Sequence, residues 1–216
     1  MIRYGFVQAG GGSTRLGTDK ALLQLAGKTM LARTVELLSK VCEDVSIVAP
    51  AGKYSNEYGP VLPDRWPGQG PLGGILTALH HINQLVPADP SPTGTRDPLC
   101  AWALIVSCDM PFLTAPFLTF LWQHASASPA HVVLPQSQTG LEPLCACWRA
   151  DVADLLQGAF DEGIRKVAQA MTRLHVEVLD GSAWKRFDSG YRLFWNINTP
   201  ADFAEARRTL GPENNE

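Results

Sequence analysis

The chain reads Val7-Gln8-Ala9-Gly10-Gly11-Gly12-Ser13-Thr14-Arg15-Leu16-Gly17-Thr18-Asp19-Lys20 near its N-terminus, where a strand pattern leads directly into a glycine-rich loop. Glycine lets the backbone adopt positive φ and lets N–H groups approach a ligand closely. Arg15 and Lys20 flank those N–H groups, and together they favour an anion such as a polyphosphate. The stretch therefore predicts a nucleotide-binding loop after the first strand.

Two well-known phosphate-binding patterns do not describe this loop. The Walker A pattern places a lysine where this chain has Thr18. The dinucleotide fingerprint fits Gly10 and Gly12 but meets Arg15 in place of its third glycine. Taken alone, the residues leave two interpretations open, a nucleotide loop of another type or a basic turn without a ligand.

Length and composition limit the class of protein. The chain has 216 residues, of which 45% are hydrophobic and 18% charged, and its formal charge is −3. These values are typical of a globular protein and give no electrostatic basis for binding nucleic acid as a polymer. We find neither a membrane-spanning apolar stretch nor a secretory leader, so we expect a cytoplasmic protein without a membrane partner. We expect a single domain over 1–210 and a polar tail over 211–216.

Apolar strand patterns alternate with amphipathic helical patterns along the chain, which predicts an α/β fold with a mainly parallel, doubly wound sheet covered by helices on both faces. The expected strands are 3–9, 45–49, 60–62, 101–106, 131–134, 143–148 and 174–178. The expected helices are 29–41, one that starts at Pro71, 114–125, 151–158, 163–171 and 200–210. Four prolines within 87–98 indicate an exposed loop inserted in the domain.

Asp109 follows the apolar run at 101–106, the pattern of a buried central strand. Ligands of open parallel sheets bind beyond the carboxyl ends of the strands, so Asp109 and the Gly10 loop should face one crevice. A carboxylate there suits Mg²⁺, which shares phosphate oxygens with its substrate. The alternative is an aspartate that caps the turn before Pro111.

Four other polar residues are candidates on chemical grounds. Asp64 could accept from the N1–H and N2–H₂ groups of guanine and thereby discriminate against other bases. Asn196 and Asn198 alternate on an expected strand, so both amides would share one face; they could bind metal or phosphate, or simply form a turn. Lys20 could stabilise charge on a leaving group or be a solvated lysine at a helix start.

The cysteines show no metal-binding spacing. The five are Cys42, Cys100, Cys108, Cys145 and Cys147. Their odd number predicts reduced and mostly buried thiols. Cys145 and Cys147 should point to one face of a strand, and Cys108 has no nearby histidine that would make it a nucleophile.

The glycine-rich stretch resembles the signature L-A-G-G-x-S-x-R-M-G-x-D-K of the MobA-like nucleotidyltransferases, above all the molybdenum cofactor guanylyltransferases. The matching residues are Ala9, Gly10, Gly11, Ser13, Arg15, Gly17, Asp19 and Lys20, whereas Gln8 replaces the usual leucine and Leu16 the usual methionine. The likeness continues, in the family's order and over nearly the whole chain, through Gly70-Pro71-Leu72-Gly73-Gly74, Ser107-Cys108-Asp109-Met110-Pro111 and Asn196-Ile197-Asn198-Thr199-Pro200.

This resemblance implies a nucleotide-diphospho-sugar transferase fold, similar to a Rossmann sheet with an antiparallel edge. It implies transfer of GMP from GTP to molybdenum-bearing molybdopterin with release of pyrophosphate. Asp109 would bind Mg²⁺ while Arg15 and Lys20 hold the triphosphate. The expected nucleotide contacts are Gln8, Ala9, Gly10, Gly11, Lys20, Asp64 and Asp109, with Gly12 as a further candidate.

Other functions stay open at this stage. Val48 occupies a position where a related molybdenum enzyme has asparagine, which bears on the choice of base. A cytidylyltransferase or a sugar-phosphate nucleotidyltransferase is the alternative within the same fold. A non-catalytic nucleotide-binding protein in cofactor delivery is the alternative of another class, and molybdenum-insertion or molybdoenzyme maturation proteins are possible partners.

Overall fold

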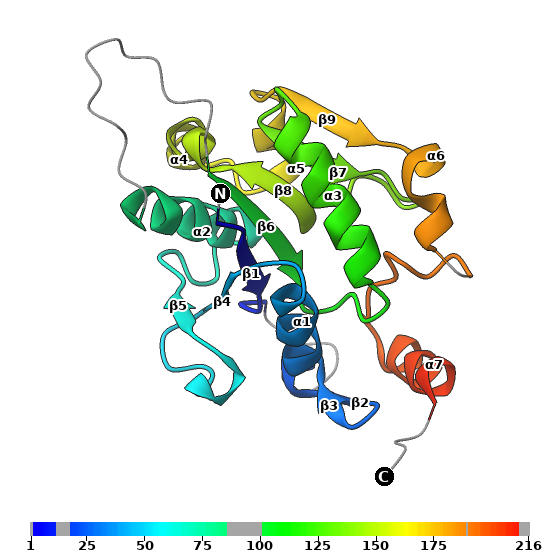
Figure 1. Ribbon diagram of the computed structural model, residues 1–216. Helices are drawn as coiled ribbons and strands as arrows, with labels where there is room; N and C mark the ends of the chain where they lie inside the picture. Colours follow the sequence, from blue (N-terminus) through cyan, green and yellow to red (C-terminus); the bar gives the residue numbers. More distant parts are fainter. Residues whose placement is uncertain (1, 12–17, 86–100, 189, 212–216) are drawn as a thin grey trace, which may run out of the picture.

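A seven-stranded sheet in the order β5-β4-β1-β6-β8-β7-β9 forms the centre of the computed structural model (Figure 1). The strands are β1 (Tyr4–Gln8), β4 (Asp44–Ala49), β5 (Val61–Pro63), β6 (Trp102–Ser107), β7 (Val132–Pro135), β8 (Cys145–Arg149) and β9 (Val176–Leu179). A separate small hairpin pairs β2 (Gln24–Leu25) with β3 (Lys28–Thr29). The structure describes residues 2–11, 18–85, 101–188 and 190–211. The predictions for Gly12, Arg15, the 87–98 loop and the 212–216 part of the tail lie outside these ranges.

The sheet is mainly parallel, as predicted. β1 pairs in parallel with β4 on one side and β6 on the other, β4 pairs in parallel with β5, and β7 with β9. Within the seven-stranded sheet, as far as the structure describes it, only β8 runs antiparallel to its neighbours. The expected antiparallel edge is therefore wrong, because β8 lies inside the sheet between β6 and β7.

Helices cover both faces of the sheet. They are α1 (Met30–Ser39), α2 (Pro71–Leu85), α3 (Ala115–Ala127), α4 (Ala153–Asp161), α5 (Val167–Met171), α6 (Gly181–Trp184) and α7 (Pro200–Leu210). In Figure 1, α1 and α3 lie across the face turned towards the viewer, and α2, α4 and α5 cover the opposite face. Short 3₁₀ turns are η1 (Lys20–Leu22), η2 (Asn56–Tyr58), η3 (Ala150–Val152) and η4 (Lys185–Phe187).

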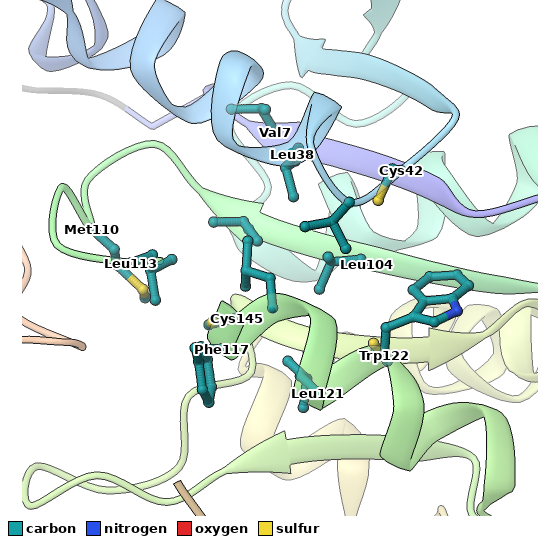
Figure 2. Close-up of a cluster of buried hydrophobic side chains, with 14 of the residues drawn as sticks. Val7, Leu38, Cys42, Leu104, Met110, Leu113, Phe117, Leu121, Trp122 and Cys145 are labelled. Carbon is teal, nitrogen blue, oxygen red and sulfur yellow. The ribbon is translucent and has the colours of Figure 1, made fainter. Parts of the chain in front are cut away.

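The sheet separates two hydrophobic cores, because side chains that alternate along a strand point to opposite faces. Cys145 and Cys147 point to the core beneath α1 and α3, while Ala146 and Trp148 point to the core beneath α2 and α4. The expectation that both cysteines share one face is confirmed. Figure 2 shows the first of these cores, to which α1 contributes Leu38, α3 contributes Phe117 and β6 contributes Leu104.

Capping residues explain where several helices begin. The Thr29 side chain accepts from the Ala32 N–H, so α1 starts one residue later than predicted. The Thr199 side chain and Asp202 form a capping box that starts α7 at Pro200. Pro71 begins α2 as predicted.

Two predicted boundaries are wrong for identifiable reasons. The helix expected from 163 begins only at Val167, because Gly163 adopts φ +90° and ends the preceding helix instead. The strand expected from 143 begins at Cys145, because the Cys145 N–H donates to the Glu142 carbonyl in a turn. No helix in the described ranges is both long enough and apolar enough to cross a lipid bilayer.

We expect Leu104→Ala to lower the free energy of unfolding by about 2–5 kcal/mol, because Leu104 is 0% exposed and its removal leaves a cavity. Leu155→Ala is the matched control, since Leu155 is 51% exposed on α4. It should change the free energy by about 0.5 kcal/mol or less. Urea denaturation of both variants tests this, and equal losses would contradict the core described here.

Candidate active site

A lysine, an aspartate and an asparagine meet beyond the carboxyl end of β6. Lys20 Nζ lies 2.8 Å from Asp109 Oδ2 and 3.1 Å from Asn198 Oδ1. Lys20 comes from η1 and Asp109 follows β6, while Asn198 precedes α7. The Lys20 and Asp109 side chains are only 17% and 16% exposed, so solvent screens their attraction less than at an open surface. Three distant segments thus converge on one charged pair.

The position of Asn198 is fixed by the start of α7. Its N–H donates to Asp202 Oδ2 at 2.9 Å, within the capping box. The neighbouring Ile197 is fully buried, and its N–H donates to the Asp109 carbonyl at 2.9 Å. The backbone therefore holds Asn198 beside Asp109.

Asn196 behaves differently from the prediction. The segment that contains Asn196 and Asn198 is not a strand, and the Asn196 amide donates to the Phe194 carbonyl at 3.3 Å. Of the two amides, Asn198 is the one with a hydrogen bond to Lys20. The shared face expected for the pair is therefore wrong, because the chain here follows the packing of Ile197 and not a strand partner.

The two oxygens of Asp109 have different surroundings. Oδ2 accepts from Lys20, whereas Oδ1 is buried and has no hydrogen-bond partner. Burying an anionic oxygen without a partner is costly, so this oxygen suits a cation. No group of three or more His, Cys, Asp or Glu side chains that could hold a metal occurs in the described ranges. One carboxylate beside phosphate oxygens fits Mg²⁺, which is commonly bound in this way.

Asp19 ties the end of the glycine-rich loop to the segment after β4. Its Oδ1 accepts from the Ala21 N–H, and its Oδ2 lies 2.9 Å from the Tyr54 hydroxyl and 3.2 Å from Lys53 Nζ. The same hydroxyl and Nζ also lie 2.9 and 3.2 Å from the Ala9 carbonyl. Burial, reinforced by Asp19, raises the pKa of Tyr54, so its hydroxyl stays protonated and can donate. Lys53 and Tyr54 are not among the residues predicted from the sequence, although their place after a parallel strand was a usable signal.

Gln8 is directed towards the first turn of α2. Its Nε2 donates to the Pro71 carbonyl at 2.8 Å, and its Oε1 is buried without a partner. A Cβ atom on Gly74 would lie 2.0 Å from this Nε2, so the amide occupies the space that the glycine leaves. Gln8 and Gly74 are therefore a coupled pair at the end of β1.

Asp64 faces the glycine-rich loop and the same turn of α2. Its Oδ1 accepts from the Trp66 N–H at 2.9 Å and from the Thr77 hydroxyl at 3.2 Å. A Cβ atom on Gly10 would lie 3.7 Å from Asp64 Oδ2, whereas one on Gly11 would meet no atom within 4 Å. The Ala9 N–H donates to the Val48 carbonyl, which continues the sheet up to the loop. The structure thus brings Gln8, Gly10 and Asp64 together around α2.

Cys108 has no nucleophilic character in this site. Its side chain is buried, and burial together with Asp109 raises the pKa of its thiol to about 12. The thiolate that attack requires is therefore scarce at neutral pH. This agrees with the interpretation of Cys108 as an inert buried thiol.

Glu142 is a buried acid that the sequence did not reveal. It is 6% exposed, and its Oε1 accepts from the Ser137 hydroxyl at 2.6 Å and from the Thr139 hydroxyl at 3.3 Å. Burial raises the pKa of Glu142, and the charge of Asp109 raises it further. Glu142 thus fixes two hydroxyls of the β7–β8 connection.

A sequence profile of the MobA-like NTP transferase domain matches residues 5–176, which include most of β1, the glycine-rich stretch and Asp109. The chain belongs to the MobA-like NTP transferase family. It is accordingly a nucleotidyltransferase, as predicted.

Relatives within this family match the chain over most of its length. A probable molybdenum cofactor guanylyltransferase of Chloroflexus aggregans is 31% identical, covering 99% of this chain and 98% of the relative. The molybdenum cofactor guanylyltransferase of Rhizobium johnstonii is 32% identical over 95% of this chain and 92% of its own. The crystal structure of molybdopterin-guanine dinucleotide biosynthesis protein A from Archaeoglobus fulgidus superposes with a TM-score of 0.78 at 25% identity, over 95% of this chain and 97% of that one. The predicted fold class is confirmed.

We expect Gly74→Ala to displace the Gln8 amide from the Pro71 carbonyl, since the new Cβ would occupy its place. Alanine should stabilise the helix by about 1 kcal/mol through its higher helix propensity. Loss of the Gln8 hydrogen bond should cost about as much, so the free energy of unfolding should change little. Gly158→Ala is the control, because its Cβ meets no atom within 4 Å in α4. It should stabilise by about 0.5–1 kcal/mol.

Chemical denaturation should therefore show Gly74→Ala to be about 1 kcal/mol less favourable than Gly158→Ala. In a Gln8→Ala background the two substitutions should become equal. A difference that persists without Gln8 would show that another contact limits residue 74.

Proposed function

We propose that this chain transfers the GMP moiety of GTP to the terminal phosphate of molybdenum-bearing molybdopterin. The observation that carries the proposal is Asp109, whose buried Oδ1 has no partner while its Oδ2 holds Lys20. This pair lies at the end of β6, beside the strand that leads into the Gly10 loop. Membership of the family and the names of the relatives support the choice of reaction.

The reaction needs no nucleophile from the protein. An oxygen of the acceptor phosphate attacks the α-phosphorus of GTP and forms a new P–O bond. The bond from that phosphorus to the bridging β-phosphate oxygen breaks, and pyrophosphate leaves with the electron pair. The chain's contribution is to orient the two phosphates in line and to stabilise the growing negative charge.

Lys20 can stabilise the negative charge of the leaving group, pyrophosphate. Its ammonium is already held between Asp109 and Asn198, so little reorganisation is needed when a triphosphate arrives. Arg15, in the same loop but outside the described residues, would add a second cation. Asp109, with the Asn198 amide beside it, would hold Mg²⁺, which when bound neutralises phosphate charge.

We expect Asp109→Asn to lower the transfer rate about 100-fold or more, because the variant keeps the shape of the side chain and loses the charge that suits a cation. Asp154→Asn on the exposed surface of α4 is the matched control and should retain wild-type activity. Release of pyrophosphate from GTP in the presence of Mg²⁺ and molybdopterin measures both. Near wild-type turnover in Asp109→Asn would rule out this role.

Lys20→Ala should lower kcat more than it weakens GTP binding, if the lysine acts mainly on charge that develops on pyrophosphate. Lys28→Ala serves as control, because Lys28 is exposed and pairs with Glu36 at the surface. Steady-state kinetics and calorimetric GTP binding separate the two effects. Equal losses in rate and affinity would make Lys20 a ground-state phosphate anchor.

Guanine is the base that the site favours. Asp64 Oδ2 faces Gly10, and its Oδ1 is fixed by Trp66 and Thr77, so one oxygen is oriented towards the loop. A fixed carboxylate accepts well from the adjacent N1–H and N2–H₂ donors of guanine. Cytosine and adenine offer no such pair of donors, and they would leave the acceptor unpaired.

We therefore expect GTP to bind more tightly than CTP, and Asp64→Ala to lose this preference at a cost of about 1–3 kcal/mol in GTP binding. Thr77→Val is the control, since it removes one fixing hydrogen bond and keeps the carboxylate. It should retain most of the preference. Tighter binding of CTP by the wild-type protein, measured by calorimetry, would favour the cytidylyltransferase alternative.

A further inference from the structure

A polar pocket lies between the β2–β3 hairpin, α1 and the turn that follows Asp109. Its volume is about 310 Å³, at the lower end of the range of small-molecule sites. We call it the basic pocket, because three cations line it together with Glu36, Met110 and Pro111; these cations are Lys28, Arg33 and Lys40. Lys20, Asp109 and Asn198 do not line it, so the basic pocket is separate from the candidate active site.

The hairpin wall of the basic pocket has a fixed backbone. The turn at Ala26 and Gly27 has φ values of +50° and +77°, and positive φ at both positions is the geometry of a tight two-residue hairpin turn. The Met30 N–H donates to the Leu23 carbonyl at 3.0 Å, which ties the hairpin to the start of α1 (Figure 1). The position of Lys28 on this wall is therefore set before any ligand binds.

Positive charge is in excess in the basic pocket. Lys28 Nζ lies 2.7 and 2.8 Å from the two carboxylate oxygens of Glu36, so these two charges balance each other. Within the described part of the chain, neither Arg33 nor Lys40 pairs with a carboxylate. They are seven positions apart, two turns along one face of α1. The chain as a whole has a formal charge of −3, so this excess is local and favours an anion.

The guanidinium of Arg33 makes little use of its five N–H donors. Its Nη1 lies 3.4 Å from the Leu25 carbonyl, longer than an ordinary hydrogen bond, and its Nε is buried without a partner. A half-buried cation with so few partners is costly. An oxyanion in the pocket would compensate this charge through the outer nitrogens, whose planar fork matches phosphate oxygens.

The charge and the walls of the pocket favour a phosphate group over other anions. A phosphate group carries a charge of about −1.5 to −2 at pH 7, which balances both Arg33 and Lys40. A single carboxylate would leave one of these cations without a counter-charge. The described walls of this pocket include no aromatic ring on which a nucleobase would stack. The features therefore fit a small phosphate compound and not a nucleotide.

We propose that the basic pocket binds a phosphate group, as inorganic phosphate or as a small phosphate monoester. Arg33 and Lys40 hold the phosphate oxygens from α1. Met110 and Pro111, which directly follow Asp109, form another wall, so the ligand joins the hairpin, α1 and this turn. A ligand that binds only the folded arrangement of these three segments stabilises it. The site requires neither GTP nor molybdopterin, so it is independent of the proposed transfer reaction.

The test titrates the full-length protein with inorganic phosphate and, separately, with glycerol 1-phosphate, followed by calorimetry. EDTA removes Mg²⁺, which would bridge phosphate to the proposed reaction site, and sodium chloride keeps the ionic strength constant. We expect binding to the wild type and at least 10-fold weaker binding to Arg33→Gln and to Lys40→Gln. Arg173→Gln is the matched control, because it loses the same charge from an exposed side chain. Lys20→Ala should also bind like the wild type.

Hydrogen exchange locates the bound phosphate. Phosphate should slow amide exchange within 24–28 and 110–113 of the wild type but not of Arg33→Gln, and thermal denaturation without phosphate shows that each variant is folded. The stronger of the two probes identifies free phosphate or a monoester as the natural form.

Three results would overturn the assignment. They are a wild type that binds neither probe, normal binding by both Arg33→Gln and Lys40→Gln, and loss of binding in Lys20→Ala, which would place the phosphate in the reaction site. Failure of GMP transfer would leave the basic pocket unaffected, and failure of phosphate binding would leave the proposed function unaffected.

Discussion

The parallel register of β1 between β4 and β6 is the constraint on which the candidate site depends. Gln8 pairs with Val48 on one side and with Ser107 on the other, so three strands end at the same level. Both faces of β1 are buried, and a slip of one residue would turn its side chains to the wrong cores. The glycine-rich loop, the Lys53–Tyr54 segment and Asp109 therefore leave the sheet together.

The charges at this edge are paired before any substrate binds. Lys20 is held by Asp109, and Lys53 by Asp19, and all four side chains are largely shielded from solvent. A cation kept in place by a carboxylate needs little rearrangement to meet a phosphate, which is how preorganised sites lower a barrier. The same pairing prevents two lysines near one loop from repelling each other in the free protein.

Much of this arrangement could be predicted from the sequence, because apolar periodicity locates strands and helices, and parallel strand ends locate Asp109 and the Gly10 loop. The direction of β8 could not be predicted, because an apolar run has the same pattern in a parallel and in an antiparallel strand. The Tyr54 hydroxyl bonds Asp19, 35 positions away along the chain, and the pKa of Glu142 is raised by burial and by the charge of Asp109. Neither relation is visible in the local sequence. The Gln8 amide likewise depends on space left by Gly74, which no local pattern encodes.

The inward position of β8 confines the β7–β8 connection to one rim of the sheet. Because it runs against β6, its first residue, Cys145, pairs with Val106 near the end of that strand. The connection from β7 therefore begins and ends at one rim of the sheet, without a helix crossing the opposite face. Insertions or substitutions in 136–144 can reshape this rim while the register on both sides persists. A change of length in this connection therefore leaves the register of β1 with β4 and β6 unaltered, and with it the position of the strand end that leads into Gly10.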